Sequence, residues 1–524
     1  MAQSAHLELG VWNLELPAMK AFLLYKDRDF DMEQRMPWNE EVLTQDLALD
    51  TFLDAMGNQD KFLLDVARKV IFSSSKDSDM ILYRHEILKD CLRNPSILRS
   101  AYDIVVEAIE EKRKSFWAFF SHRSPNSVLY GANESMRIFV AKLKFLRSIA
   151  DEHGHEFKSS GFSRMFTMLR KELSDEYFEE IESHLTYLRS DHDVLVSAEL
   201  GTGNKGTNYV LRKPPNLKVS WMKRITLAVS RKSEPFTFRL DPRDERGAEA
   251  LGNLRDCGMN LVANALAQSA DHIQSFFDML RIELGFYLGC LNLYERLEQK
   301  GSPVCFPVPA PADERIHSFV GLYDVCLALR TEGKVVGNDA DADGKDLVVI
   351  TGANQGGKST FLRSIGLAQL MMQSGMFVAA ESFSANLCTG IFTHYKREED
   401  TTMESGKFDE ELRRMSSIAD HVTPDSLLLF NESFAATNER EGSEIATQIV
   451  SALLEKRNEV FFVTHLYSLA HGFHERRTDN ALFLRAERGD DGSRTFKLRV
   501  AEPLETSYGK DLYDGIFVTL NHIQ

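Results

Sequence analysis

The chain has 524 residues, 43% hydrophobic and 27% charged, which is enough for several globular domains of about 150 residues each and typical of neither a disordered nor a collagen-like protein. Lys and Arg number 62 against 78 Asp and Glu, so the net charge of −16 argues against a uniformly basic nucleic-acid-binding surface but permits a local one. The six cysteines form no C-x-x-C pair, so they predict neither a zinc site nor a disulfide framework and favour the reducing cytoplasm. We expect neither a secretory signal nor a membrane span.

An N-terminal segment, 1–39, precedes a region, 40–310, that is predicted to form a helical core with levers. Apolar residues recur at spacings of three and four in the runs LTQDLALDTFLDAM, KFLLDVARKVIF, ILYRHEILKDCL and SMRIFVAKLKFLRSIA. At about 193–240 the pattern changes to short β-branched and aromatic runs such as DVLVSAEL and NYVLRK, which predict a β-rich, clamp-like insertion. A long helical stretch follows at about 245–300. Two helical blocks around one β insertion suggest a lever with a tip.

The segment 301–314 holds four of the fourteen prolines and is the clearest domain boundary. Beyond it, over 316–524, apolar strand-like runs alternate with helical ones, as in KDLVVI, STFLRSIGLAQLMMQ, SLLLF, SEIATQIVSALLEK and EVFFVTH. This alternation predicts a largely parallel sheet with helices on both faces. The expected fold is therefore multidomain, with the helical region followed by an α/β P-loop domain.

A P-loop pattern, G-x-x-x-x-G-K-S, lies between the predicted strand LVVI and the predicted helix TFLRSIGL. The predicted phosphate-binding residues are Gly352, Ala353, Asn354, Gln355, Gly356, Gly357, Lys358, Ser359 and Thr360. In such a loop the backbone N–H groups face the phosphates, Lys358 reaches the β and γ oxygens, and Ser359 offers its hydroxyl to Mg²⁺. The strand and helix on either side disfavour the alternative, a chance glycine turn.

Two further strand ends carry polar residues. The apolar run Leu427–Phe430 ends in Asn431 and Glu432, the Walker B position, where an Asp normally orders the water shell of the magnesium ion. The amide of Asn431 brings no negative charge, so we expect Mg²⁺ to be held less firmly. Glu432 is placed to act as the general base, although a polar cap on a strand end is the alternative. His465 ends the run EVFFVT and could sense the γ-phosphate, but a lone histidine there is more often structural.

Together these motifs resemble the MutS family of ABC-type ATPases. The stretch ITGANQGGKSTFLRSIGLAQLMMQSGMFVAAE is similar to the family's ITG-N-GGKST block, and NESFAATNEREG to its D-E-x-x-x-x-T-x-x-x-E/D-G block, with Thr437, Glu441 and Gly442 in matching places. VTHLYSLA resembles A-T-H-x-x-x-L, which makes His465 the switch histidine, and Ser507-Tyr508-Gly509 matches S-Y-G. The resemblance covers about residues 316–520, while 40–310 match only in layout.

The resemblance implies a head-to-tail homodimer in which each nucleotide also meets a signature segment of the other subunit. Glu404–Leu412 resembles the family's S-T-F-x-x-E-M, with Gly406 and Lys407 in place of Ser-Thr and Ser405 one position early. A helix is predicted at 407–419, directly after Gly406. Either Ser405 and the N-terminus of this helix present hydrogen-bond donors to the phosphate bound by the other subunit, or activation across the dimer is weakened. An ordinary helix N-cap explains Ser405 equally well.

The layout also predicts what the chain lacks. Members of the family that read mismatches carry an N-terminal domain with a Phe-x-Glu wedge and a connector domain, together roughly 250 residues. Because the helical core is predicted to begin near residue 40, we expect a short branch of the family without mismatch reading by an intercalated Phe. We also expect no nuclease-type domain after the ATPase region.

A local basic surface is predicted within the β-rich insertion. The window 201–233 contains eight Lys or Arg and no Asp or Glu, so its net charge is +8. Because the whole chain has a net charge of −16, the rest of the chain has a net charge of −24. These residues are Lys205, Arg212, Lys213, Lys218, Lys223, Arg224, Arg231 and Lys232. With Tyr209 and Trp221 among them, they suit a surface that follows a nucleic-acid backbone, although a solvated β-hairpin is the alternative. The run 112–120, also basic and aromatic, has helical spacing and fits core packing better.

These observations predict a homodimeric, Mg²⁺-dependent ATPase whose closing motor domains move helical levers and so open or close a clamp around DNA in repair or recombination. Structured RNA or a ribosome remains an open alternative partner, because backbone recognition by charge does not choose between them. The opposing function is a nucleotide-switched scaffold that binds ATP with little hydrolysis. Asn431 and the altered signature segment motivate that alternative.

Overall fold

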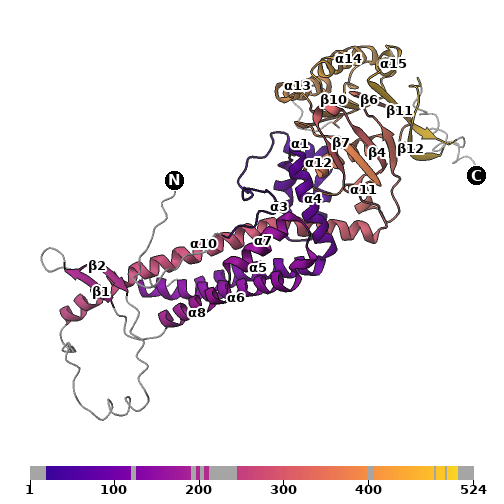
Figure 1. The fold of residues 1–524 in the computed structure, drawn as a ribbon. Helices are drawn as coiled ribbons and strands as arrows, with labels where there is room; N and C mark the ends of the chain where they lie inside the picture. The colour runs from indigo at the N-terminus through magenta and orange to yellow at the C-terminus, as the bar shows by residue number, and fades with distance from the viewer. Residues whose placement is uncertain are drawn as a thin grey trace, which may run out of the picture. The chain divides into compact units, whose positions relative to one another are not determined.

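The computed structural model describes residues 19–119, 125–189, 196–200, 206–211, 245–397, 406–476, 479–489 and 493–505. Contacts divide the chain into two units. One is formed mainly by Arg99–His155 and Ser163–Arg281, and the other by Phe22–Leu98, Glu156–Phe162 and the chain from Ile282 onward. Figure 1 shows the elements of both, and the following paragraphs take each unit by itself. Within the described residues, no helix is both long and apolar enough to cross a membrane.

The first unit is built from long helices. They are α5 (Pro95–Phe119), α6 (Pro125–His153), α7 (Ser160–Glu172), α8 (Asp175–Arg189) and α10 (Glu245–Gln299), with α5, α7 and α10 also contributing residues to the second unit. Phe139 of α6 stacks on Phe277 of α10 at 5.3 Å, and both side chains are buried. Lys142 of α6 forms ion pairs with two glutamates of α5. Apolar stripes at helical spacing therefore face a shared core, and the charged residues bridge neighbouring helices at its edge.

Two short strands lie in the region of the predicted β-rich insertion. β1 (Val196–Leu200) pairs antiparallel with β2 (Gly206–Leu211), with Val196 opposite Leu211. β1 falls within the predicted run DVLVSAEL, whereas β2 begins two residues before the run NYVLRK and ends within it. The rest of the insertion, including all eight basic residues proposed to touch nucleic acid, lies outside the described residues.

The second unit contains two sheets. The larger has the order β12-β11-β6-β10-β9-β8, with β12 antiparallel to β11 and the other neighbours parallel. The smaller has the order β3-β7-β4-β5. The strands of the larger sheet are β6 (Leu347–Gly352), β8 (Ile391–Tyr395), β9 (Leu427–Asn431), β10 (Glu459–Val463), β11 (Ala481–Arg488) and β12 (Arg494–Val500). Those of the smaller sheet are β3 (Val308–Ala310), β4 (His317–Leu322), β5 (Asn338–Asp341) and β7 (Ser382–Asn386).

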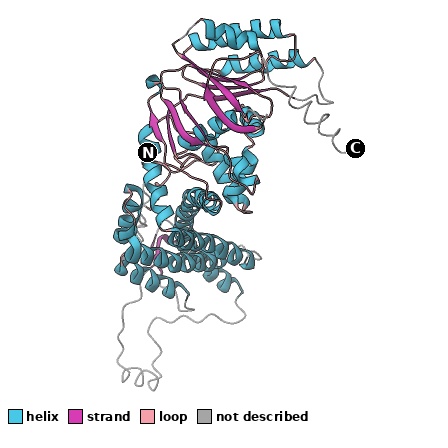
Figure 2. Cartoon of the chain, turned by 90° about the vertical axis from the view of Figure 1, so that its right-hand side faces the viewer, coloured by secondary structure: helices cyan, strands magenta, loops and turns pink. Residues whose placement is uncertain are grey.

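Helices pack on the two faces of the larger sheet, whose strands Figure 2 shows among the helices. Successive side chains of a strand point to opposite faces. Val349, Phe430 and Phe462 share a core with α13 (Lys407–His421), α14 (Glu439–Glu455) and α15 (Tyr467–Glu475). Leu429 points the other way, toward Gly366 of α12 (Lys358–Gln373). The buried strands are near-continuous apolar runs because both faces are covered.

Four N-terminal helices belong to the same unit as the sheets. They are α1 (Glu40–Asp46), α2 (Leu49–Gly57), α3 (Lys61–Phe72) and α4 (Ser78–Arg93). The side chain of Asn39 donates to Ile391 O on β8 at 2.8 Å, and Arg397 pairs with the buried Asp46 at 2.9 Å. Sequence pattern placed these helices in one helical region, 40–310, whereas their contacts place them with the sheets.

Candidate nucleotide site

The loop that follows β6 has the backbone that its glycines predict. Gly352, Gln355 and Gly357 have φ values of 106°, 59° and 86°, in the left-handed region that favours glycine. A Cβ on Gly356 would lie 2.8 Å from Ala486 Cβ and 2.9 Å from Ala353 O. The loop therefore curls tightly against β11 before α12 begins at Lys358. Its nine predicted residues, Gly352 to Thr360, lie together at the carboxyl end of β6 and the start of α12.

Lys358 lies buried inside this loop. Its Nζ donates to Gly352 O at 3.1 Å and to Ala353 O at 2.9 Å. Burial lowers the pKa of Lys358 to about 8, the charge of Glu432 opposes that shift, and Arg494 adds to it. The ammonium of Lys358 is therefore bound by backbone oxygens of its own loop, at the N-terminus of α12. It is placed to release these oxygens and bind the oxygens of an anion instead.

Ser359 and Asn431, the two predicted magnesium ligands, are brought together. Ser359 Oγ donates to Asn431 Oδ1 at 2.8 Å, although the two residues are 72 positions apart in the sequence. Strand β10 lies between β6 and β9 in the sheet, so the parallel order brings the ends of these strands to one edge. The pair offers two uncharged oxygens.

Glu432 and His465 also meet. His465 Nε2 lies 3.1 Å from Glu432 Oε1, and Glu432 N donates to Val463 O at 2.8 Å. The hydrogen bond from His465 is the main cause of a lowered pKa at Glu432, with burial acting in the opposite direction. Glu432 has φ of 54°, a conformation that costs a residue with a side chain roughly 1–2 kcal/mol. The carboxylate is thus kept ionised and presented from a strained backbone.

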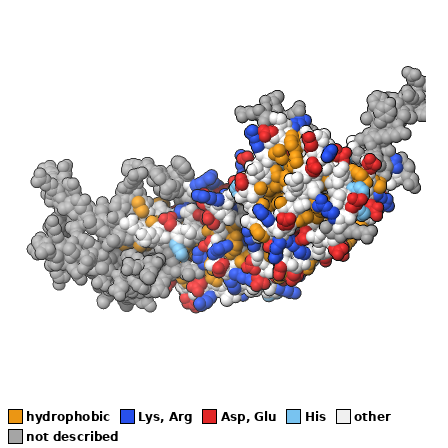
Figure 3. All heavy atoms as spheres, turned by 90° about the horizontal axis from the view of Figure 1, so that it is seen from above, with side chains coloured by type: hydrophobic (Ala, Val, Ile, Leu, Met, Phe, Trp, Pro, Cys, Tyr) orange, Lys and Arg blue, Asp and Glu red, His pale blue; other side chains and the backbone are white. Residues whose placement is uncertain are grey.

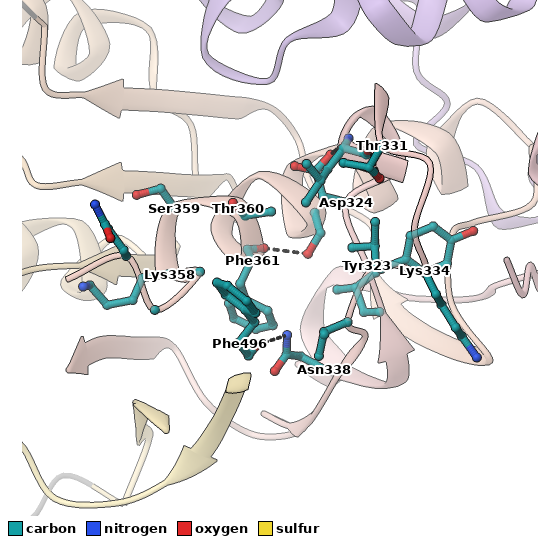
Figure 4. A pocket seen from close by; sticks show the side chains of 18 of the residues that line it. Tyr323, Asp324, Thr331, Lys334, Asn338, Lys358, Ser359, Thr360, Phe361 and Phe496 are labelled. Carbon is teal, nitrogen blue, oxygen red and sulfur yellow. Dashed lines mark hydrogen bonds between the residues drawn. The ribbon is translucent and has the colours of Figure 1, made fainter. Parts of the chain in front are cut away.

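Lys358, Ser359 and Glu432 line a cavity of about 560 Å³, within the size range of small-molecule sites, whereas Asn431 and His465 are not among its lining residues. Its walls include the loop from Asn354 to Thr360 and Glu432, and continue to Tyr323, Val336 and Phe496. Figure 4 shows Phe496 beside Asn338, whose Nδ2 donates to Phe496 O at 3.2 Å. Leu498 N donates to Asn338 Oδ1 at 2.7 Å, so both ends of this amide serve to join β5 to β12.

Sequence reasoning missed this second wall of the cavity. Phe496 has φ of 58° and is 48% exposed, which is unusual for an aromatic residue within a strand. Tyr323 and Asn338 lie 29 and 14 positions before Gly352 and match no short motif. The available signal was the aromatic residue in the run RTFKLRV, but its partner strands are not apparent from local pattern.

Of the remaining predicted site residues, the structure describes Gly406 but not the others. Gly406 is exposed and is the N-cap residue of α13, without a side-chain cap. Ser405, the eight basic residues of the insertion and the Ser507-Tyr508-Gly509 motif lie outside the described residues. In the view of Figure 3, Lys and Arg side chains are interspersed with Asp and Glu over the described surface.

Three residues of the run NESFAATNEREG, which resembles a motif of the MutS family, have structural roles in the loop after Glu432. Thr437 Oγ1 donates to Glu441 Oε2 at 2.9 Å, and Glu441 N donates to the N-cap side chain of Asn438 at 3.0 Å. A Cβ on Gly442 would lie 2.4 Å from Phe434 O, so a side chain there would collide with the loop. These residues shape the loop between β9 and α14.

Comparison with known proteins identifies the family. A family model described as the MutS2 N-terminal domain matches residues 76–300, and one described as MutS domain V matches residues 348–515. The chain is 27% identical over 255 residues to MutS protein homolog 4 of Mus musculus, covering 47% of this chain and 25% of that protein. It is 28% identical over 328 residues to the DNA mismatch repair protein msh3 of Aspergillus terreus, covering 60% and 28%. It is 32% identical over 161 residues to the DNA mismatch repair protein MutS of Clostridium kluyveri, covering 30% and 18%.

The chain thus spans between 18% and 28% of the length of these relatives. The two family models nevertheless match separate parts of it, one mainly helical and one containing the glycine loop, Glu432 and His465. The structure agrees in being multidomain, with long helices and mixed α/β sheets. The chain belongs to the MutS family.

Proposed function

We propose that this protein is a Mg²⁺-dependent ATPase of the MutS type, which uses ATP hydrolysis to open and close a DNA clamp in DNA repair or recombination. The observation that carries the proposal is the hydrogen bond between His465 and Glu432, 3.1 Å long, at the ends of two neighbouring parallel strands. Glu432 lines the same cavity as Lys358. An ionised carboxylate beside a phosphate-binding loop is the arrangement expected of a general base for the attacking water.

The cavity divides into a polar and an apolar part. The backbone N–H groups of the glycine loop, the N-terminus of α12 and the ammonium of Lys358 would bind the phosphates. Phe496 and Tyr323, on the opposite wall, would contact the adenine ring. His465 donates to Glu432 and orients its carboxylate, while Glu432 takes the proton of the water that attacks the γ-phosphate.

Ser359 Oγ and Asn431 Oδ1 fit a magnesium ion in ligand type, because Mg²⁺ binds oxygen ligands and keeps several of its waters. The fit is weaker than in a site with an aspartate, since both oxygens are neutral. When bound, the ion neutralises charge on the phosphate oxygens. Asn431 would accept a hydrogen bond from a metal-bound water, and Ser359 would give its hydroxyl oxygen to the metal.

The family relationship extends the proposal to a homodimer and a clamp. Ser405 and Gly406, at the start of α13, would meet the nucleotide of the second subunit. The eight basic residues of the insertion, Lys205, Arg212, Lys213, Lys218, Lys223, Arg224, Arg231 and Lys232, would contact the DNA backbone. These residues would contact phosphate groups only, so we expect the protein to bind DNA without preference for a base sequence.

Steady-state ATP hydrolysis tests the enzymatic part. Wild-type protein should hydrolyse ATP, Glu432→Ala should abolish hydrolysis, and Asn431→Asp should equal or exceed the wild type because it restores the missing charge. Asp420→Asn is a matched control, since Asp420 is an exposed residue of α13 outside the segment 404–412. Equal background hydrolysis in all of these proteins would contradict the proposal.

A nucleotide-switched scaffold is the second candidate, and Asn431 is the observation that favours it. A site with two neutral oxygens and no aspartate can bind ATP while turning it over slowly. This candidate predicts nucleotide binding by wild-type protein with hydrolysis no faster than that of Glu432→Ala. Binding without turnover would therefore decide for the scaffold.

Retention of nucleic acid tests the clamp. Charge reversal at Lys213, Lys223 and Arg224 should abolish salt-sensitive retention of DNA, because each lost phosphate contact weakens binding and flattens its salt dependence. Reversal of three exposed lysines outside the insertion, the cavity and the signature segment, Lys76, Lys171 and Lys456, is the matched control. Unchanged DNA retention in the insertion variant would exclude this surface, and retention of structured RNA in preference to DNA would change the substrate class.

A further inference from the structure

Part of the cavity wall is formed by a short helix, α11 (Val325–Arg330), and by the segment directly after it. Leu327 of this helix lines the cavity, as do Thr331 and the run 333–336. In Figure 4, Thr331 lies on the side of the cavity away from Lys358. The position of this wall therefore depends on what holds the two ends of α11.

The N-terminus of α11 is held by Asp324, which also lines the cavity. Its Oδ1 accepts from Leu327 N at 3.0 Å, and its Oδ2 forms an ion pair with Arg363 of α12. The side chain of Asp324 is fully buried. This end of the short helix is therefore fixed to the helix that begins at the phosphate-binding loop.

The C-terminus of α11 is held by Lys300, the residue directly after α10. Its Nζ donates to Ala328 O at 2.8 Å, to Leu329 O at 3.2 Å and to Thr331 O at 2.6 Å. The last carbonyls of a helix have no partner within the helix, and an ammonium has three N–H donors and a charge that suits this end of a helix. Lys300 thus binds two of these carbonyls and fixes the point from which the chain continues into the cavity wall.

The end of α10 is itself held in place. Asn292 Nδ2 donates to Met56 O at 2.9 Å, and Arg296 donates to Asn58 Oδ1 at 2.9 Å. These contacts, α11 and the end of α10 all belong to the second unit. Lys300 therefore joins a fixed helix end to the wall of the cavity.

We propose that Lys300 is a positioning residue for nucleotide binding, which holds the wall segment 331–336 in place and links it to the end of α10. Lys300 does not itself line the cavity. The proposal rests on the proposed function, in which ATP occupies this cavity. A lysine that only capped a helix would stabilise α11 without making α10 respond to nucleotide, so the two roles differ in a measurable way.

Two variants separate the ammonium of Lys300 from the rest of its side chain. Lys300→Met keeps an unbranched apolar stem without donors, whereas Lys300→Arg keeps a charged group with several N–H donors. Lys300 is exposed, so we expect both variants to fold. In a titration with a fluorescent ATP analogue, Lys300→Met should bind about fivefold more weakly, with KM for ATP raised by a similar factor and kcat within about twofold of the wild type.

Lys300→Arg should stay within about twofold of the wild type in affinity, KM and kcat. Lys456→Met is the matched control and should change none of these values. Lys456 is also an exposed lysine directly after a helix, and it lies outside the cavity. Equal effects of Lys300→Met and Lys456→Met would overturn the proposal.

Hydrogen–deuterium exchange measures the wall and the end of α10 without hydrolysis. In nucleotide-free protein, amides of 331–337 should exchange at least about threefold faster in Lys300→Met than in the wild type, with 352–360 unchanged. A saturating non-hydrolysable ATP analogue should slow exchange of 352–360 in both proteins but should slow exchange of 297–302 in the wild type only. Amides 300–302 report on the end of α10 because they donate to carbonyls of its last turn.

The outcomes decide the two parts of the proposal separately. Wild-type affinity and wild-type exchange of 331–337 in Lys300→Met would overturn the positioning role. Protection of 297–302 by the analogue in both proteins, or in neither, would overturn the link to α10. Acceleration of 352–360 as large as that of 331–337 would also overturn the proposal, because it would reveal a general loss of stability. If the wild-type protein binds no ATP, the proposed function fails, and exchange of the nucleotide-free proteins still decides whether Lys300 holds the wall.

Discussion

Removal of the His465 side chain should move the pH dependence of hydrolysis in a defined direction. The pKa of Glu432 is lowered, chiefly by the hydrogen bond from His465. A base must be ionised to act, so activity is present above this pKa and is lost as the pH falls through it. His465→Ala should therefore raise the pH at which kcat falls on the acidic side.

The size of this shift follows from the geometry. A hydrogen bond to a charged group contributes about 1.5–3 kcal/mol, and solvent weakens it where the partners are accessible. The side chains of His465 and Glu432 are 31% and 32% exposed, which places the contribution near the lower end. About 1.4 kcal/mol corresponds to one pKa unit, so we expect the acidic limb to move up by about one pH unit.

The assay is kcat for ATP hydrolysis at saturating nucleotide between about pH 3.5 and 8, a range that includes the acidic limb below the ordinary pKa of a glutamate, with the fold checked by circular dichroism at each pH. His465→Gln is the matched variant, because its amide can still donate to the carboxylate but cannot become charged. It should keep most of the wild-type profile. An acidic limb at the same pH in wild-type and His465→Ala proteins would refute the reasoning.

Three further predictions concern residues whose neighbours are known. Gly356→Ala places a Cβ 2.8 Å from Ala486 Cβ and should weaken ATP binding at least about tenfold, measured by titration with a fluorescent nucleotide. Unchanged affinity would mean that the loop can shift to make room for the Cβ. Gly442→Ala places a Cβ 2.4 Å from Phe434 O and should lower the free energy of unfolding by about 1–3 kcal/mol, measured by urea denaturation. An unchanged free energy of unfolding would show that the loop can move without cost. Phe496→Ala should raise KM for ATP about tenfold with little change in kcat, because it removes a stacking surface; a fall in kcat alone would argue against that role.

Local pattern was sufficient for the central strands. The runs LVVI, LLLF and EVFFV are apolar and buried on both faces, and they form β6, β9 and β10 within a residue or two of the expected positions. The same logic placed polar residues at the strand ends. Parallel strands bring their carboxyl ends to one edge, and there the structure places Ser359 beside Asn431 and His465 beside Glu432.

Local pattern was insufficient where long-range packing decides. The placement of α1 to α4 with the sheets depends on contacts such as Asn39 with Ile391, which are 352 positions apart. Phe496 lines the cavity only because β12 pairs with β11, and Asn338 holds it from a different sheet. The left-handed backbone at Glu432 and Phe434 could not be predicted either, because neither residue is a glycine.

Single-turnover hydrolysis of ATP by wild-type protein and by Glu432→Gln tests the central claim most directly, because it separates nucleotide binding from chemistry. With protein in excess over radiolabelled ATP and Mg²⁺ present, both proteins should retain the nucleotide on a filter. Only the wild type should convert the bound ATP to ADP, with Glu432→Gln at least about a hundredfold slower. Conversion at the same rate in both proteins would contradict the assignment of Glu432 as the general base and, with it, the proposed mechanism.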